Sequence, residues 1–187
     1  MMKFDDKIEG ERIVLELPKA TFEQAKEIFA LVEVSREELR PWLDWCDKTK
    51  TPEDEFSGFL KDWCEANRES GTGFTYLIRE KSTGAFCGTV DIFKLDDEHK
   101  TGEIGYWLGT PYVGKGYMHE AVELLEKQAF AKGCHRIVIQ NATENLRSAH
   151  VAERAGYHLD GVMRQNRWSE YHGKFVDSNV WSKLKGE

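Results

Sequence analysis

Apolar and polar residues follow two different spacings along this chain of 187 residues. In residues 11–17 apolar side chains occupy every second position, which is typical of a strand with one buried face. From Phe22 to Val32 they recur three or four positions apart, which indicates an amphipathic helix. The same patterns predict helices over 21–40, 51–70, 115–132 and 144–155, and strands over 11–17, 74–79, 86–94, 100–108, 135–140, 157–168 and 174–184. This order predicts a mixed α/β fold.

Capping and helix-breaking residues support these boundaries. Thr21 begins a capping-box pattern, and Thr51 precedes Pro52, a residue that favours the first position of a helix. Gly133 and Gly156 follow the last two helical segments and are expected to end them. Short polar turns separate the strands between residues 74 and 108, so these strands are expected to form hairpins.

The composition fits a single domain over residues 1–187, which is long enough to bury a core without disulfides. The N-terminus lacks a hydrophobic signal core, and no apolar run approaches the thickness of a bilayer, so we expect a cytoplasmic protein without a membrane partner. A net charge of −7 argues against a general nucleic-acid binder. The four cysteines are widely spaced, which favours reduced thiols over disulfides or a zinc site.

The stretch from Gly102 to Phe130 is the most informative part of the chain. A strand-like run is followed by a turn with Gly114-Lys115-Gly116 and then by a helical pattern. Glycines allow the backbone to approach a ligand closely, and the first amides of a helix are free to bind an anion. These features predict a phosphate cradle on the amides of residues 113–118.

Several segments together resemble the GCN5-related N-acetyltransferase (GNAT) superfamily, and within it the branch of the RimJ and RimL ribosomal-protein N-terminal acetyltransferases. These segments are LRPWLDW at 39–45, EIGYWL at 103–108, VGKGYM at 113–118 and NATENLRSAHVAERAGYHLDGVMR at 141–164. The resemblance covers nearly the whole chain and implies a GNAT-type acyl-CoA N-acyltransferase fold, in which helices flank a central mixed, mostly antiparallel sheet. The superfamily often has Gln or Arg three residues before the first glycine, where this chain has Pro111.

The resemblance also implies acetyl-CoA as the cosubstrate. Its pyrophosphate would lie on Val113, Gly114, Lys115, Gly116, Tyr117 and Met118, and its pantetheine arm along Tyr106, Trp107 and Leu108 and beside Asn141 and Asn145. Ser148 would lie near the sulfur and stabilise the departing thiolate. Asn145 also fits a helix cap, and Lys115 also fits a solvated lysine of a first helical turn.

Acetyl transfer to nitrogen requires a base, because an alkyl amine is mostly protonated at neutral pH. Glu103 is the first candidate for this base and for acceptor binding, since a carboxylate attracts a cationic amine and can take its proton through water. The alternative is a charge paired within the sheet. The resembling branch has a glutamate near the position of Arg167 in this chain, and Glu170 follows three residues later as a second candidate.

Aromatic residues offer a floor for the acceptor pocket. Trp42, on a turn, is the candidate for this floor, whereas Trp63 is expected to pack in the core. The segment HEAVE at 119–123 lacks the second histidine of a zinc-protease helix, so no metal site is expected.

The leading hypothesis is an acetyl-CoA-dependent N-acetyltransferase that acts on a protein N-terminal α-amine by direct attack in a ternary complex. The α-amine has a lower reference pKa than a lysine side chain, which makes it the easier nucleophile. The alternatives are acetylation of a small amine, such as a polyamine, an aminoglycoside or an amino acid, and a non-catalytic acyl-CoA sensor. A nucleotide-binding domain is disfavoured because the chain lacks the corresponding glycine motifs. A homodimer is compatible with the sequence, but no segment demonstrates it.

Overall fold

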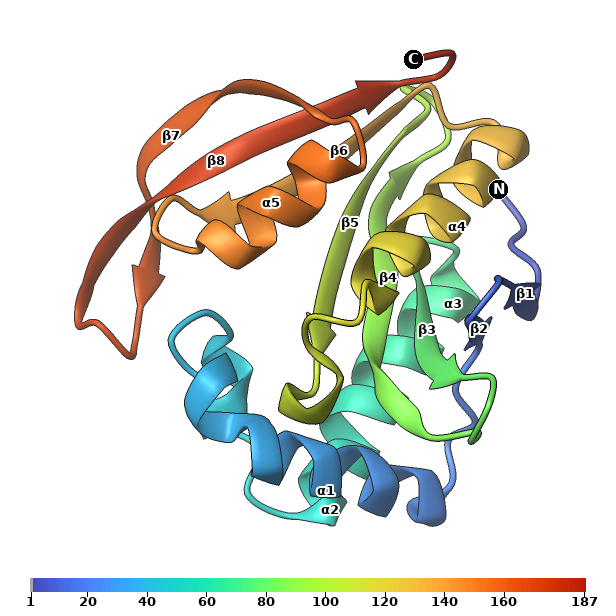
Figure 1. The fold of residues 1–187 in the computed structure, drawn as a ribbon, viewed down its shortest axis with the longest axis vertical. Helices are drawn as coiled ribbons and strands as arrows, with labels where there is room; N and C mark the ends of the chain where they lie inside the picture. Colours follow the sequence, from blue (N-terminus) through green and yellow to red (C-terminus); the bar gives the residue numbers. More distant parts are fainter. Residues whose placement is uncertain (1) are drawn as a thin grey trace.

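The computed structural model describes residues 2–187 and contains an eight-stranded sheet with helices on both faces (Figure 1). The strand order is β1-β2-β3-β4-β5-β6-β8-β7, and all neighbours are antiparallel except β5 and β6. The strands are Lys7–Glu9 (β1), Ile13–Glu16 (β2), Phe74–Glu80 (β3), Phe86–Asp96 (β4), Thr101–Leu108 (β5), Arg136–Ala142 (β6), His158–Ser169 (β7) and Lys174–Leu184 (β8). The prediction of a mixed, mostly antiparallel sheet flanked by helices is confirmed.

The helices divide between the two faces of the sheet. They are Phe22–Leu39 (α1), Pro52–Asp54 (α2), Ala66–Ser70 (α3), Tyr117–Lys132 (α4) and Leu146–Arg154 (α5), with 3₁₀ turns at Asp44–Asp47 (η1) and Thr110–Tyr112 (η3). In Figure 1, α4 lies in front of the central strands and α3 behind them. None of the helices in the described part of the chain is long and apolar enough to cross a membrane.

Each face has its own hydrophobic core. Ile104 belongs to the cluster under α4 and α5, whereas Trp107, three residues further along β5, packs with residues of α1 on the opposite face. This separation follows from the two-residue period of a strand, which directs alternate side chains to opposite faces. All four cysteines are buried and unbridged.

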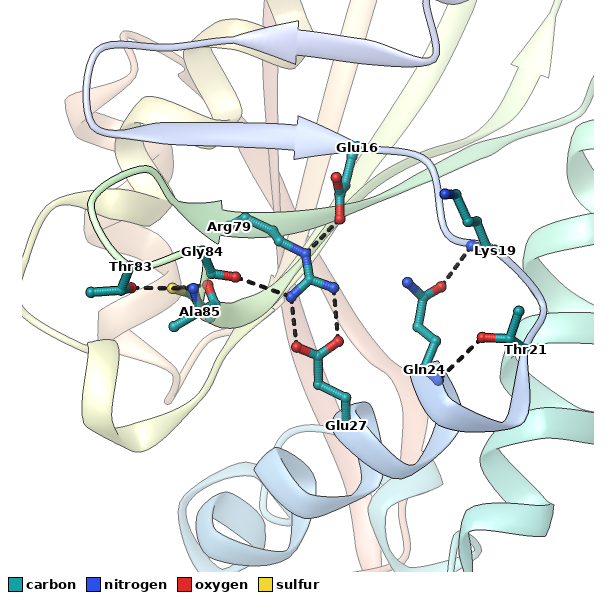
Figure 2. A network of polar contacts seen from close by, with 10 residues as sticks. Glu16, Lys19, Thr21, Gln24, Glu27, Arg79, Thr83, Gly84 and Ala85 are labelled. Carbon is teal, nitrogen blue, oxygen red and sulfur yellow. Dashed lines mark hydrogen bonds and ion pairs between the residues drawn. The ribbon is translucent and has the colours of Figure 1, made fainter.

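Arg79 of β3 fixes α1 to the edge of the sheet (Figure 2). Its guanidinium donates to both carboxylate oxygens of Glu27 on α1, at 2.6 and 2.7 Å, and to Glu16 on β2. Nearby, the Thr21 hydroxyl caps α1 by accepting from the Gln24 amide, as the sequence predicts. The Gln24 side chain accepts from the amide of Lys19, two residues before Thr21, so the capping box is only half formed.

The predicted helix over residues 51–70 is present, but its middle section is a π-helix and not an α-helix. Thr51 and Asp54 form a reciprocal capping box, and Pro52 occupies the first turn. Residues Glu55–Glu65 (η2) then form a π-helix, at whose end the Ala66 amide donates to Lys61, five residues earlier. π-Helical segments are rare and often occur at functional sites. Strand β1 was not predicted, because its three residues are too few to show a period.

Strands β5 and β6 pair over only part of their length. Their parallel register runs from Thr101 opposite Arg136 to Ile104 opposite Ile139 and then ends. Beyond it, Gly105–Leu108 still pair with β4 on one side, and Gln140–Ala142 still pair with β8 on the other. The two strands therefore diverge within the sheet, which leaves one edge of Gly105–Leu108 without a partner strand.

Candidate active site

The turn between β5 and α4 has the geometry that its glycines predict. Gly114 and Gly116 have φ angles of 82° and 80°, in the left-handed region that glycine adopts without strain. Within residues 2–187, the amides of residues 114–119 donate to no protein acceptor. Unbonded N–H groups at the start of a 16-residue helix are suited to an anion.

Arg12 holds this turn in place through hydrogen bonds to its carbonyl oxygens. Its guanidinium donates to the carbonyl oxygens of Lys115 at 2.7 Å and Gly116 at 3.3 Å, and Glu120 of α4 accepts from its Nε at 2.9 Å. The N–H and C=O of a trans peptide unit point in opposite directions. Because the two carbonyls face Arg12, the amides of Gly116 and Tyr117 face away from it. Sequence reasoning missed Arg12, which is 103 positions from Lys115.

The Lys115 side chain lies toward protein groups. Its Nζ lies 5.1 Å from the centre of the Tyr112 ring and 4.0 Å from Glu80 Oε1. This ammonium therefore already has protein contacts, and the contribution of Lys115 to phosphate binding remains a prediction.

The open edge of β5 continues from the turn toward α5. Tyr106 reaches across the divergence, and its hydroxyl lies 3.1 Å from both the hydroxyl and the carbonyl oxygen of Ser148. Burial raises the pKa of Tyr106 to about 12, although the hydrogen bond with Ser148 lowers it, so the phenol is neutral at physiological pH and can donate. Tyr106 and Ser148 thus form a pair of hydroxyls between the two diverging strands.

The two predicted asparagines are both engaged by the protein. The Asn145 side chain caps α5 by accepting from the Ser148 amide at 3.1 Å, which fits the structural interpretation of this residue. Asn141 is buried, accepts from Trp181 at 2.8 Å and donates to Ala142 and Asn145. Asn141 therefore positions the start of α5 through its side chain, and cofactor binding by either asparagine remains a prediction.

A cavity of about 580 Å³ lies on the α1 face of the sheet, next to the open edge of β5. Three elements supply most of its wall: η2, the middle of β4, and residues 105–107 of β5. Its aromatic side chains are Trp45, Phe59, Trp63, Phe93, Tyr106 and Trp107. This volume is typical of a small-molecule site.

Trp42 is not among the described residues that line this cavity. Its ring lies near His172, and its carbonyl oxygen accepts from Arg167, which also pairs with Asp44 at 3.2 Å. Trp45 and Trp63 line the cavity instead. The expectation that Trp63 packs in the core is wrong, since 39% of its surface is exposed.

Asp91 on β4 is a site residue that sequence reasoning missed. Its carboxylate faces the cavity beside Gly105, and within residues 2–187 it has no hydrogen-bond or ion-pair partner. Burial, with a smaller contribution from the negative charge of Glu103, raises the pKa of Asp91 to about 7. A side chain with this pKa can accept a proton at neutral pH. The alternating pattern of β4 marks position 91 as a polar residue on the α1 face, but it does not reveal the cavity.

Glu103 lies on the same face of the sheet, since its register partner Phe93 is two residues from Asp91. Its Oε2 accepts from Lys94 at 2.8 Å and from Gln140 at 3.2 Å. Lys94 reaches it from a β-bulge with a φ of 51°. Glu103 is therefore paired within the sheet, which is the alternative that the sequence left open, whereas Glu170 is exposed in the β7–β8 turn.

The diverging strands, the turn with its unbonded amides and the cavity all adjoin β5. The family model for the acetyltransferase (GNAT) domain matches residues 12–158, so the chain belongs to the GNAT family and is an N-acetyltransferase.

Known proteins similar to this chain include two kinds of acetyltransferase. The ribosomal-protein-serine acetyltransferase of Escherichia coli (strain K12) is 24% identical over 91% of this chain and 92% of its own length. The microcin C7 self-immunity acetyltransferase MccE, solved with acetyl-CoA and AMP, superposes with a TM-score of 0.85 at 26% identity over 93% of each chain. RimL, the ribosomal L7/L12 α-N-protein acetyltransferase, superposes with a TM-score of 0.87 at 22% identity over 95% of this chain and 97% of its own. These superpositions confirm the predicted GNAT fold.

Proposed function

We propose that this protein transfers the acetyl group of acetyl-CoA to a primary amine, by direct attack in a ternary complex. The observation that carries this proposal is the continuous path from the unbonded amides of residues 114–119, along the open edge of Gly105–Leu108, to the cavity. The crystallised complex of MccE with acetyl-CoA supports the identity of the donor.

The residues along this path fit coenzyme A. The amides of the turn suit its pyrophosphate, and the open strand edge offers backbone groups to the amides of its pantetheine arm. Bound in this way, acetyl-CoA supplies an activated thioester. Ser148 and Tyr106, which lie 3.1 Å apart between the diverging strands, can donate hydrogen bonds to the departing sulfur.

Asp91 is the group that we assign as the base. As the new bond forms between the amine nitrogen and the acetyl carbon and the bond from carbon to sulfur breaks, Asp91 takes the proton that the nitrogen loses. Burial is the main cause that brings the pKa of Asp91 to about 7, and the negative charge of Glu103, which is held by Lys94, adds to it. In this assignment Glu103 positions charge, and Asp91 contacts the acceptor.

A protein N-terminal α-amine is the acceptor that the relatives favour. The E. coli relative is named for acetylation of a ribosomal-protein serine. A small amine is the second candidate, and the observation that favours it is the cavity lined by carboxylates and aromatic rings. We further propose a cytoplasmic location and homodimer formation, which cell fractionation and light scattering test.

The experiment that tests this function combines peptides and small amines with purified protein and acetyl-CoA. Release of free thiol, together with a mass increase of one acetyl group on the amine, is the expected result. A folded protein that binds coenzyme A but acetylates neither class of amine would contradict the proposed transfer.

A further inference from the structure

Two carboxylates on the wall of the cavity have no partner within the described chain, residues 2–187. One is Asp91, and the other is Glu55, at the first position of the π-helix η2. Glu55 is only 2% exposed, and its Oε1 is buried without a hydrogen-bond donor. A buried carboxylate without a partner is costly, so the site gains stability when a cationic ligand enters.

None of the described groups around Glu55 forms a hydrogen bond or an ion pair with its carboxylate. Arg36 of α1 attracts it, but Nε and Nη2 of Arg36 donate to Glu33 and to the carbonyl oxygen of Thr49. Its Nη1 is buried without an acceptor, and among the described residues no ion pair within 4.0 Å joins Arg36 to Glu55. Asp54, in the preceding turn, adds repulsion. Burial therefore dominates and raises the pKa of Glu55 to about 7, although the charge of Arg36 lowers it.

Asp91 and Glu55 both lie close enough to Cys64 to raise the pKa of its thiol. The pKa of the buried Cys64 thiol on η2 is raised to about 12, first by burial and then by contributions that include the charges of Asp91 and Glu55. Aromatic rings line the space around them, with Trp63 and Phe93 at 5.8 Å and Trp45 and Trp107 at 5.8 Å between ring centres. Such rings suit both apolar groups and cations.

Acidic residues outnumber basic residues on the cavity wall. Its acidic residues are Asp54, Glu55, Asp62 and Asp91, and Lys48 is the basic residue among the described residues that line it. One carboxylate is sufficient for the reacting amine, and Asp91, on β4 opposite Gly105 of β5, is placed for that role. Glu55, on a different wall, is left for a second positive group.

We propose that the acceptor is a dication with a short apolar spacer: its reacting amine lies at Asp91, its spacer contacts the aromatic rings, and its second cationic group binds Glu55. This inference deepens the proposed function and rests on it. A free aliphatic diamine has this chemistry, and so does a peptide whose first residue is lysine, with its α-amine and side-chain ammonium.

The test compares acceptors that differ by one charge. Free-thiol release is measured with 1,5-diaminopentane against pentylamine, and with a Lys-first peptide against the same peptide beginning with norleucine. We expect kcat/KM to be roughly 10- to 100-fold higher for the dicationic member of at least one pair, as for loss of one hydrogen-bonded charge. The pair that shows the preference identifies a small amine or a peptide as the source.

The variant Glu55→Gln then tests whether Glu55 binds the second cationic group. It should reduce that preference to within about threefold by raising KM for the dication alone. Glu53→Gln, a matched change at an exposed position of the adjoining helix α2 outside the cavity wall, should leave the preference unchanged. If Glu55 only neutralises Arg36, Glu55→Gln will change both members of each pair equally, and this outcome overturns the inference.

A binding measurement separates this inference from the proposed function. In calorimetry with coenzyme A present, wild-type protein should bind 1,5-diaminopentane more tightly than pentylamine, or the Lys-first peptide more tightly than its norleucine counterpart. Acetyl transfer without any preference for dications sinks the inference and leaves the function intact. Preferential binding without transfer sinks the function alone. Wild-type preferences decide the matter even if the Glu55 variant fails to fold.

Discussion

Among single residues, Asp91 shows how burial prepares a carboxylate for chemistry. An aspartate in water has a pKa near 4 and is a weak base, whereas Asp91, half-buried and near the charge of Glu103, has a pKa of about 7. The same environment that destabilises the charged form makes it a better proton acceptor. The ionisation of Asp91 is therefore expected to make both the catalytic rate and the stability of the fold depend on pH.

We predict that Asp91→Asn lowers kcat by about 10²- to 10⁴-fold, the usual contribution of a general base. In the wild type, kcat/KM should fall as pH decreases through about 7, because Asp91 is then protonated and cannot accept a proton. Steady-state rates between pH 5.5 and 9 measure both effects.

Glu103→Gln should retain activity and move the acidic limb of the pH profile to lower pH, because it removes a charge that raises the pKa of Asp91. If Glu103→Gln abolishes the limb while Asp91→Asn keeps it, the two roles are reversed.

The same pKa predicts an effect on folding stability. In the unfolded chain Asp91 ionises near pH 4, and in the folded protein it ionises near pH 7. Between these values the folded state binds more protons than the unfolded state, so this residue lowers stability as pH rises from 4 to 7. We therefore expect Asp91→Asn to raise Tm more at pH 8 than at pH 5. An equal shift at both pH values in thermal unfolding would show that Asp91 has an ordinary pKa.

Gly114 and Ser148 should separate binding from turnover. Gly114 has a φ of 82°, so Gly114→Val strains the turn and displaces its amides. We expect coenzyme A affinity to fall more than about 100-fold, whereas Ser148→Ala should lower kcat by roughly tenfold with little change in affinity. Calorimetry and steady-state kinetics measure the two quantities. Equal losses of affinity in both variants would contradict these roles.

At the scale of elements, the start of α4 depends on the N-terminal segment before β2. Arg12 holds the two carbonyls of the turn and also bonds with Glu120 on the first turns of the helix. Arg12 bonds with carbonyl oxygens and a carboxylate of the protein, so we expect it to orient the amides of the turn and not to bind phosphate itself.

We predict that Arg12→Ala weakens coenzyme A binding by roughly tenfold, since the loss of its charged hydrogen bonds lets the turn relax. Arg12→Lys should recover only part of the affinity, because lysine lacks the fork that spans both carbonyls. Arg164→Ala, which removes an exposed arginine on β7, is the control for loss of charge. Unchanged affinity in Arg12→Ala would show that the glycines alone orient the amides.

At the scale of the whole molecule, local signals were readable from the sequence and distant contacts were not. Gly133 and Gly156 end α4 and α5 in the left-handed conformation, as their positions indicate. Arg12 and Asp91 escaped prediction because their roles come from elements brought together by the fold. The position of Glu103 was readable, but its pairing with Lys94 depends on a bulge that the period of β4 does not reveal.

The divergence of β5 and β6 gives the last prediction, because it determines which backbone groups a ligand can protect. In the free protein, the amides of residues 114–119 have no protein acceptor within the described chain, and one edge of Gly105–Leu108 has no partner strand. Hydrogen–deuterium exchange should therefore be fast at residues 114–119 and slow in β3, which is paired on both sides. Coenzyme A should slow exchange over residues 105–119, leave β3 unchanged, and have no such effect on Gly114→Val. Protection that begins elsewhere in the sheet would place the donor outside the divergence and remove the physical basis of the proposed transfer.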